Sequence, residues 1–242
     1  MRIAAKTDMG QVRLRNEDYY GVGELPGGFV WAVICDGMGG AAGGDVASRS
    51  AVQLISGALA SSFQEHMSSR SIKNLLVTAL DNANTRVYDL AEGNDALMGM
   101  GTTVVAAIVN GRKACIAHAG DSRAYLLSGG GSMQLTKDHS VVQAMVDNGQ
   151  LTEDEARDHP RKNLLTRVLG VAETLEADYC EEELPPGGVL LLCTDGLTNC
   201  VDSAQFPALL AQNGFAGLAD NLVQLANEQG GQDNITVVAI EC

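Results

Sequence analysis

The stretch VVAAIVNGRKACIAHA, residues 104–119, decides the fold class of this chain. It contains two mostly apolar runs of strand length on either side of Asn110-Gly111. Asn-Gly between two β-rich runs is a strong hairpin signal, because both residues readily adopt the positive φ angles of a type I′ turn. The stretch therefore predicts two antiparallel strands joined by a tight turn.

The rest of the chain alternates between strand-like and helix-like patterns. Runs typical of strands occur at 29–36, 122–127, 174–184, 189–195 and 234–242. Apolar residues take helical spacing from Gly44 onward, again over 72–90, and in two segments from about 203 and over 217–228. Hairpins together with paired helices argue against the strict strand-helix alternation of a parallel sheet. We therefore expect an α+β fold in which layered antiparallel sheets are covered by helices.

Residues 138–168 differ from their surroundings, because they are polar and helix-prone. Thr152 and Glu155 have the spacing of a capping box. We interpret this segment as a small flap subdomain inserted into a single domain that spans residues 1–242. A length of 242 residues suits one large domain.

Composition excludes several classes of protein. The net charge of −14 disfavours nucleic acid as a partner, because phosphate backbones are bound by Lys and Arg. The chain has no apolar stretch of membrane-spanning length and no export signal at its start, so we expect a cytoplasmic protein that does not bind membranes. The cysteines lie far apart without metal-site spacing, and we expect free thiols at Cys35, Cys115, Cys180, Cys193, Cys200 and Cys242.

Aspartates recur at the ends of the expected strands. Asp36 and Asp195 each end an apolar run and precede glycine, Asp121 lies between two strands, and Asp233 precedes the last strand. With the acidic residues of 16–18, they are expected to meet in one pocket, which requires cations because clustered carboxylates repel one another. Carboxylate oxygens without His or Cys favour Mg²⁺ or Mn²⁺, and a shared carboxylate holds two such ions together.

The glycines after Asp36 fit the same interpretation. We expect Gly37 to bring its carbonyl to an ion without a Cβ in the way, and Gly39 and Gly40 to turn the chain beside the pocket. A single Asp-Gly after a strand is more often an ordinary turn, so the interpretation depends on the joint occurrence of several. The sequence contains no P-loop, no Gly-x-Ser-x-Gly elbow and no His-Glu-x-x-His motif.

The order of motifs resembles the bacterial form of the metal-dependent protein phosphatase family, type 2C. The resemblance runs from about residue 5 to 240 and is carried by RLRNED, DGMGG, GMGTT, AGDSRAY, LTKDHS, LLTRVLG, LLLCTDGLTN and GGQDNITVV. It implies a four-layer α-β-β-α sandwich, with two central antiparallel β-sheets flanked by helix pairs. It also implies hydrolysis of phosphoserine or phosphothreonine in proteins.

The resemblance assigns roles to particular residues. Asp36 would bridge two metals, the Gly37 carbonyl would bind one of them, and Asp195 and Asp233 would complete the set. The remaining roles are metal-bound waters held by Asp18 and Glu17, a third metal site at Asp121 with Asp195, and phosphate binding by Arg13. The implied mechanism is direct attack on phosphorus by a hydroxide that bridges the two metals, without a phosphoenzyme.

One position departs from many eukaryotic relatives, which have a proton-donating histidine two residues after the bridging aspartate. This chain has Met38 there, so the general acid is unassigned. His118, His139 and a metal-bound water remain the candidates.

The leading hypothesis is a monomeric phosphatase that uses two Mn²⁺ or Mg²⁺ ions, with a third as a further option, and reverses a bacterial Ser/Thr kinase. One alternative is a catalytically silent module of the same fold that binds a signalling partner. Another is a dimetal phosphoesterase for small molecules. The chain also resembles stand-alone phosphatases found beside kinases that control type VI secretion, which gives an expected association with that regulation.

Overall fold

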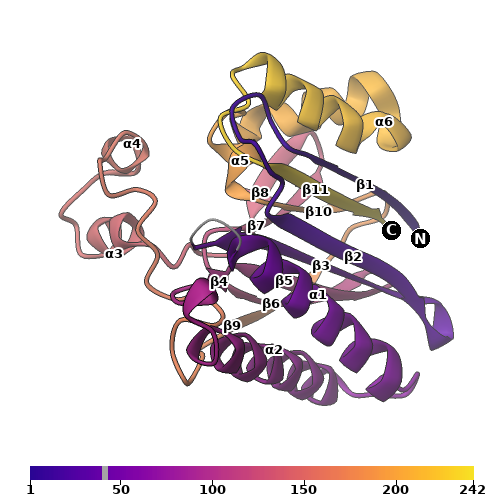
Figure 1. Ribbon diagram of the computed structural model, residues 1–242. Coiled ribbons are helices and arrows are strands. Elements are labelled where there is room, and N and C mark those ends of the chain that lie inside the picture. The colour runs from indigo at the N-terminus through magenta and orange to yellow at the C-terminus, as the bar shows by residue number, and fades with distance from the viewer. Residues whose placement is uncertain (40–42) are drawn as a thin grey trace.

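Two antiparallel β-sheets face each other at the centre of the molecule, and helices cover their outer faces (Figure 1). The computed structural model describes residues 1–39 and 43–242. The first sheet has the order β1 (Arg2–Asp8), β11 (Ile235–Glu241), β10 (Val189–Cys193), β7 (Arg123–Ser128) and β8 (Gly131–Gln134). The second sheet has the order β2 (Asp18–Leu25), β3 (Phe29–Met38), β5 (Val104–Asn110), β6 (Lys113–Ala119) and β9 (Asp178–Glu183), and β4 (Gly101–Thr102) pairs with the end of β3.

Helices form the two outer layers. The second sheet is covered by α1 (Gly43–Ser62) and α2 (Ser69–Glu92), and the first sheet by α5 (Asp195–Thr198) and α6 (Phe206–Glu228). Short 3-10 turns lie at Pro26–Gly28, Asp95–Leu97 and Ser203–Gln205. The expected four-layer α-β-β-α sandwich is therefore confirmed.

Three apolar clusters fill the spaces between these layers. In β3, Val33 and Cys35 pack in the cluster under α1 and α2, whereas Ala32 and Ile34 pack against the facing sheet. Successive side chains of a strand point to opposite faces. Because both faces of β3 are covered, every position is apolar, which explains the continuous run at residues 29–35.

The hairpin expected at residues 104–119 is present. Asn110 of β5 pairs with Lys113 of β6, and Gly111 in the turn has a φ of 54°. Asn110 remains in the strand and does not take a positive φ, so Gly111 alone supplies the left-handed residue of the turn.

Three strands of the sandwich, β1, β2 and β8, were not expected from the sequence. The strands β1 and β2 were not predicted, because residues 2–8 and 18–25 mix polar and apolar residues without a long apolar run. The two helical segments expected after residue 203 are both present within α6, on either side of a break at Gly214, where φ is 69° and ψ is 172°. A glycine with this φ interrupts the regular helix, which is why the pattern separates into two stretches.

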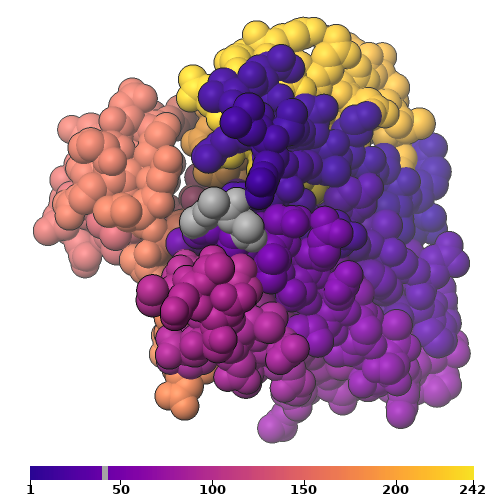
Figure 2. All heavy atoms as spheres, in the orientation of Figure 1, coloured from indigo at the N-terminus to yellow at the C-terminus, as the bar shows by residue number. Residues whose placement is uncertain are grey.

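The flap consists of α3 (Val141–Asp147), α4 (Glu153–Arg157) and their connections, and it lies outside the sandwich (Figure 2). The capping box predicted in this segment is present at the start of α4. The Thr152 hydroxyl accepts from the Glu155 N–H, and the Glu155 carboxylate accepts from the Thr152 N–H. The sequence pattern therefore located the second flap helix correctly.

All six cysteines carry free thiols, as expected. Cys35, Cys115 and Cys193 are buried, where a thiol packs as a small apolar side chain. Among the described residues, no helix is both long enough and apolar enough to cross a membrane.

Candidate metal centre

Five aspartates at or near the ends of strands converge at one end of the sandwich. Asp36 lies near the end of β3, and Asp18 is opposite it in β2. Asp121 follows β6, Asp233 precedes β11, and Asp195 is the first residue of α5. The expectation that Asp195 ends a strand was wrong, because β10 stops two residues earlier. The charges of the other four aspartates all act on Asp36, so the fold brings the five carboxylates together.

Asp18 joins the two sheets. Its Oδ2 atom accepts hydrogen bonds from Thr194 Oγ1 at 2.8 Å and from Thr236 Oγ1 at 2.6 Å, both on the first sheet's side. Burial raises the pKa of Asp18 to about 7, and the charges of Asp195 and Asp233 add to this rise. The two hydroxyl hydrogen bonds lower the pKa but do not offset the burial. Asp18 is thus a fixed, buried carboxyl group among like charges.

The backbone of Asp36 is held on both sides. Its N–H donates to Thr103 Oγ1 at 3.0 Å, and its carbonyl accepts from Thr102 Oγ1 at 2.8 Å and from the Thr103 N–H at 2.9 Å. Burial raises the pKa of Asp36 well above its usual value, and the charges of Asp18 and Asp195 raise it further. A rigid strand end therefore presents a carboxyl group whose charge is unfavourable without a cation.

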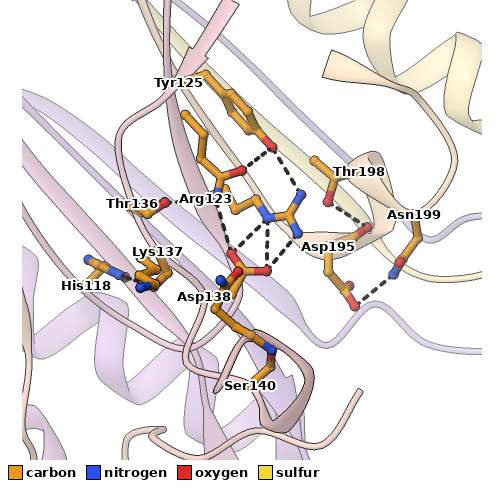
Figure 3. A network of polar contacts seen from close by, with 12 residues as sticks. His118, Arg123, Tyr125, Thr136, Lys137, Asp138, Ser140, Asp195, Thr198 and Asn199 are labelled. Carbon is orange, nitrogen blue, oxygen red and sulfur yellow. Dashed lines mark hydrogen bonds and ion pairs between the residues drawn. The ribbon is translucent and has the colours of Figure 1, made fainter. Parts of the chain in front are cut away.

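Asp195 and Asp121 occupy the side of the centre that faces the flap. Asn199, the residue after α5, donates from Nδ2 to Asp195 Oδ2 at 2.9 Å (Figure 3). Burial raises the pKa of both aspartates; the charge of Asp233 adds to the rise at Asp195, and the charge of Asp195 adds to the rise at Asp121. Arg123 lowers the pKa of both, so one cationic side chain already acts on this side.

Two buried oxygens in this centre, Asp18 Oδ1 and Asp195 Oδ1, have no hydrogen-bond partner among the described residues. A buried carboxylate oxygen without a partner is costly. Hard carboxylate oxygens are the ligands that Mg²⁺ and Mn²⁺ prefer. The donor set therefore fits divalent cations, which would use these oxygens and offset the mutual repulsion.

Two glycines let the backbone segments of the centre approach closely. A Cβ on Gly37 would lie 2.1 Å from the Gly44 carbonyl oxygen and 2.6 Å from the Glu17 carbonyl oxygen. A Cβ on Gly196 would lie 1.9 Å from the Asn234 carbonyl oxygen. The close contact of backbone with backbone therefore favours glycine at both positions.

The turn expected after Met38 begins at Gly39. Gly39 has a φ of 110°, and its carbonyl accepts the Gly44 N–H at 3.2 Å. Glycine reaches such a φ readily, so Gly39 has its expected role. Gly40, which was expected to share it, lies outside the described residues.

Arg13 lies at the mouth of the centre and pairs with one of its aspartates. Its Nη2 atom is 2.6 Å from Asp233 Oδ2, while Asp233 Oδ1 accepts the Asn234 N–H at 2.9 Å. The hydrogen bond with Asp233 raises the pKa of Arg13, and the charges of Asp36 and Asp195 contribute further. The Arg13 side chain is 54% exposed, so it can reach both the centre and a ligand from solvent.

Glu17 connects the N-terminal loop to the centre through its backbone. Its N–H donates to Asn234 Oδ1 at 2.8 Å, and its carbonyl accepts from the Gly37 N–H at 3.1 Å and from Ser48 Oγ at 2.6 Å. Burial raises the pKa of the Glu17 carboxyl group, and Arg13 lowers it. The side chain is half-buried, and the charges of Arg13 and Asp233 act on it.

The two histidines considered as general acids stack on each other instead. The rings of His118 and His139 are parallel within 10°, with centroids 4.8 Å apart. His118 Nε2 is 2.9 Å from the Lys137 carbonyl, and His139 Nδ1 accepts the Gly120 N–H at 3.2 Å. None of these contacts among the described residues reaches the aspartate cluster. The geometry therefore assigns neither histidine as the proton donor.

His118, His139 and Asp178 form a second group whose ligand atoms lie within 4.8 Å of one another. Because the Gly120 N–H donates to His139 Nδ1, the neutral ring carries its proton on Nε2, 3.3 Å from Asp178 Oδ2. Arg167 Nη1 is also 3.0 Å from Asp178 Oδ1. A metal ion would have to displace a proton and a guanidinium, so this group fits a metal less well than the aspartate centre.

Sequence reasoning missed the residues that hold the aspartates in place. These are Thr102, Thr103, Thr194, Thr236 and Asn234, whose side chains bond Asp36, Asp18 or the Glu17 backbone. A signal existed for some of them, because Thr194 and Thr236 are isolated hydroxyls in otherwise apolar runs. An isolated hydroxyl in a buried strand needs a partner, but sequence alone does not name it.

The raised carboxyl pKa values predict a characteristic pH dependence of stability. A carboxyl group whose folded pKa exceeds its unfolded value of about 3.9 binds its proton more tightly in the folded state. Its stabilising effect is complete below that value and is lost as pH rises, which for Asp18 spans about pH 4 to about 7. The lowered pKa of His139, a single group, acts in the opposite direction.

With a chelator present, urea denaturation is therefore expected to show lower stability at pH 7 than at pH 5. Each such group contributes up to about 1.4 kcal/mol per pH unit. Asp18→Asn should make the decline shallower, and saturating Mn²⁺ should remove it. A metal-free protein that becomes steadily more stable from pH 5 to pH 7 would contradict this account.

The chain matches a known protein family over most of its length. The family model for protein phosphatase 2C matches residues 10–236. The chain belongs to this family. The protein phosphatase 2C sandwich thus accounts for the two sheets, the helix layers and the position of the aspartate centre between them.

Relatives of this phosphatase match nearly its whole length. It is 39% identical over 242 residues to serine/threonine phosphatase stp of Listeria innocua, covering 100% of this chain and 96% of the relative. It is 34% identical to protein phosphatase PhpP of Streptococcus pneumoniae, covering 99% and 97%. The chain is therefore a protein serine/threonine phosphatase, and its substrates are phosphorylated proteins.

Solved structures show the same fold. The serine/threonine phosphatase of S. agalactiae superposes with a TM-score of 0.92 at 35% identity, covering 98% of both chains. The catalytic domain of PstP in complex with two manganese ions superposes with a TM-score of 0.84 at 34% identity, covering 98% of this chain and 96% of that one. The phosphatase is accordingly metal-dependent.

Proposed function

We propose that this phosphatase hydrolyses phosphoserine and phosphothreonine with two divalent cations held by Asp36, the Gly37 carbonyl, Asp195 and Asp233. The observation that carries this proposal is the aspartate cluster itself. Its carboxyl groups are buried among like charges, and Asp195 Oδ1 has no partner among the described residues. Such a cluster is unfavourable unless cations are bound.

Other residues around the cluster are proposed to bind water, a further cation or the phosphoryl group. Bound cations of this kind lower the pKa of water and offset charge on phosphoryl oxygens. Asp18 and Glu17 would hold ordered waters, and Asp121 with Asp195 would provide a further acidic site. Arg13 carries a fork of N–H donors, which suits two phosphoryl oxygens once the guanidinium turns from Asp233.

Met38 has no proton to give to the serine or threonine oxygen that leaves. It lies two residues after Asp36 and is 38% exposed, so this side of the centre is open to solvent. Water supplied from solvent, rather than a dedicated side chain, is the proton source that this arrangement favours.

We further propose that residues 1–242 act as one catalytic unit, with the flap at 138–168 inserted. The metals are Mn²⁺ or Mg²⁺, because the donors are carboxylate and carbonyl oxygens. The enzyme would oppose a bacterial Ser/Thr kinase on shared phosphoprotein substrates. Comparing phosphoproteomes of deletion and parent strains would identify those substrates.

Hydrolysis of a phosphothreonine peptide is expected to need added Mn²⁺ and to stop with excess chelator. Released phosphate is the measurement, and a nucleoside monophosphate serves as the comparison substrate. Phosphopeptide turnover that survives complete chelation would contradict the metal assignment. Faster turnover of the nucleotide would favour a small-molecule phosphoesterase instead.

Arg13→Gln is expected to raise KM for the phosphopeptide about 10- to 100-fold. A hydrogen bond to a charged group contributes about 1.5–3 kcal/mol, and each 1.4 kcal/mol is a factor of ten. Mn²⁺ affinity measured by calorimetry should stay level or rise, because the guanidinium no longer competes for Asp233. Arg86→Gln, on the exposed face of α2, is the control. An unchanged KM would remove Arg13 from phosphate binding.

A further inference from the structure

A groove of about 800 Å³ separates the flap from the sandwich (Figure 2). It begins at Asp121 and Asp195 of the metal centre. One wall comes from α3 and α4, the other from α5 and the loop after it, and the floor from β7 and β8. This volume lies in the range of ordinary ligand pockets and exceeds what a phosphoryl group needs.

An ion pair on the floor of the groove joins the flap to the sandwich. Arg123 of β7 donates from Nε to Asp138 Oδ1 at 2.9 Å and from Nη2 to Asp138 Oδ2 at 2.7 Å (Figure 3). Arg123 Nη1 also donates to the Tyr125 hydroxyl at 3.2 Å, and Gln134 Nε2 donates to Asp138 Oδ1 at 3.2 Å. The Asp138 side chain is only 10% exposed. The pair is therefore bidentate, largely buried and supported by neighbours.

The same short segment fastens both ends of the flap. At its start, His139 bonds Gly120 twice, through its N–H to the Gly120 carbonyl at 2.9 Å and through Nδ1 to the Gly120 N–H at 3.2 Å. At its end, the Thr166 N–H donates to the His139 carbonyl at 2.8 Å. Residues 138–140 and 164–167 thus form a root beside Asp121.

Apolar packing does not fix the position of the flap. The three apolar clusters of the described residues include no residue of α3 or α4. Val142 is buried, but it lies in the groove wall and not in these clusters. The orientation of the flap relative to the metal centre therefore depends on the polar contacts at its root, of which the Arg123–Asp138 pair is the most enclosed ion pair.

We propose that Arg123 and Asp138 are positioning residues for protein substrates. The pair holds the flap root so that the groove receives the polypeptide around a phosphoresidue whose phosphoryl group lies at the metal centre. This inference rests on the proposed function. A small phosphate ester reaches the metal centre without filling the groove. Loss of the Arg123–Asp138 pair should therefore affect the hydrolysis of peptides more than that of small esters.

The test compares a phosphothreonine peptide of about ten residues with p-nitrophenyl phosphate in the Mn²⁺-loaded enzyme. Arg123→Met, Asp138→Asn, their double variant and Arg123→Lys are used, and Lys6→Gln is the control because Lys6 pairs with Asp220 on an exposed surface. We expect the ratio of peptide to ester kcat/KM to fall about tenfold in each single variant, mainly through the peptide KM. The double variant should fall no further, because the two residues act as one unit.

Hydrogen exchange gives the second measurement. Amides at 138–168 should exchange faster in the variants, and their exchange rates should be unchanged in Lys6→Gln. Arg123→Lys should give intermediate rates, because lysine keeps the charge but loses the bidentate geometry. An unchanged ratio in variants that retain their melting temperature overturns the inference. A lower ratio with unchanged exchange also overturns it, because the pair would then contact substrate directly. If the unaltered, Mn²⁺-loaded enzyme did not hydrolyse the ester, that result would instead contradict the proposed function.

Discussion

Asp36→Asn is expected to lower phosphopeptide turnover at least about 1000-fold. A bound metal contributes several kcal/mol to offsetting transition-state charge, and about 4 kcal/mol corresponds to a factor of about 1000. The same change should stabilise the metal-free protein by roughly 1–2 kcal/mol, because it removes a buried carboxyl group from a cluster of like charges. Mn²⁺ should then raise the melting temperature of the variant less than that of the unaltered enzyme.

The measurements are phosphate release and thermal unfolding with and without Mn²⁺. Asp89→Asn, on the exposed face of α2, is the matched control and should change neither quantity. The informative outcome is a variant that loses activity but gains stability, since a misfolded variant would lose both. Full activity in Asp36→Asn would exclude this residue as the shared metal ligand.

Gly196→Ala is expected to destabilise the protein by about 3 kcal/mol and to weaken Mn²⁺ binding at least about tenfold. The new Cβ would lie 1.9 Å from the Asn234 carbonyl oxygen, which is backbone and cannot rotate away. Gly196 follows Asp195 and Asn234 follows Asp233, so relieving the clash must push these two aspartates apart. A small change at a position without a functional group should thus disrupt the centre.

Gly57→Ala provides the control for this prediction. Gly57 is in α1 and a Cβ there meets no atom within 4 Å, so alanine should stabilise the helix by about 0.5–1 kcal/mol. Urea denaturation and Mn²⁺ calorimetry distinguish the two glycines. Equal stability of Gly196→Ala and the unaltered protein would show that the two backbone segments are free to separate.

The sequence was most informative where one local rule dominates. Asn110-Gly111 predicted the hairpin because few residues fit such a turn, and the run at 29–35 predicted β3 because both faces of that strand are covered. The Thr152–Glu155 capping box located α4 in the same way. By contrast, β1 and β2 lack a long apolar run and were missed.

The roles of individual glycines were less accessible. At Gly37, the sequence did not predict that the Gly44 and Glu17 carbonyls lie where its Cβ would be. The partners in that contact are distant in the chain, so no local pattern reveals them. By contrast, the two helical segments expected after residue 203 are present on either side of the break at Gly214.

The sequence by itself determined the antiparallel layers and the candidate aspartates, because turn chemistry, burial and the placement of carboxylates at strand ends are encoded locally. Only the tertiary structure decided how those aspartates are held. Thr194 and Thr236 reach Asp18 from the other sheet, and Arg123 pairs with Asp138 at the root of the flap. These contacts join residues separated by up to 218 positions, and their partners are set by how the sheets pack rather than by any neighbouring residue.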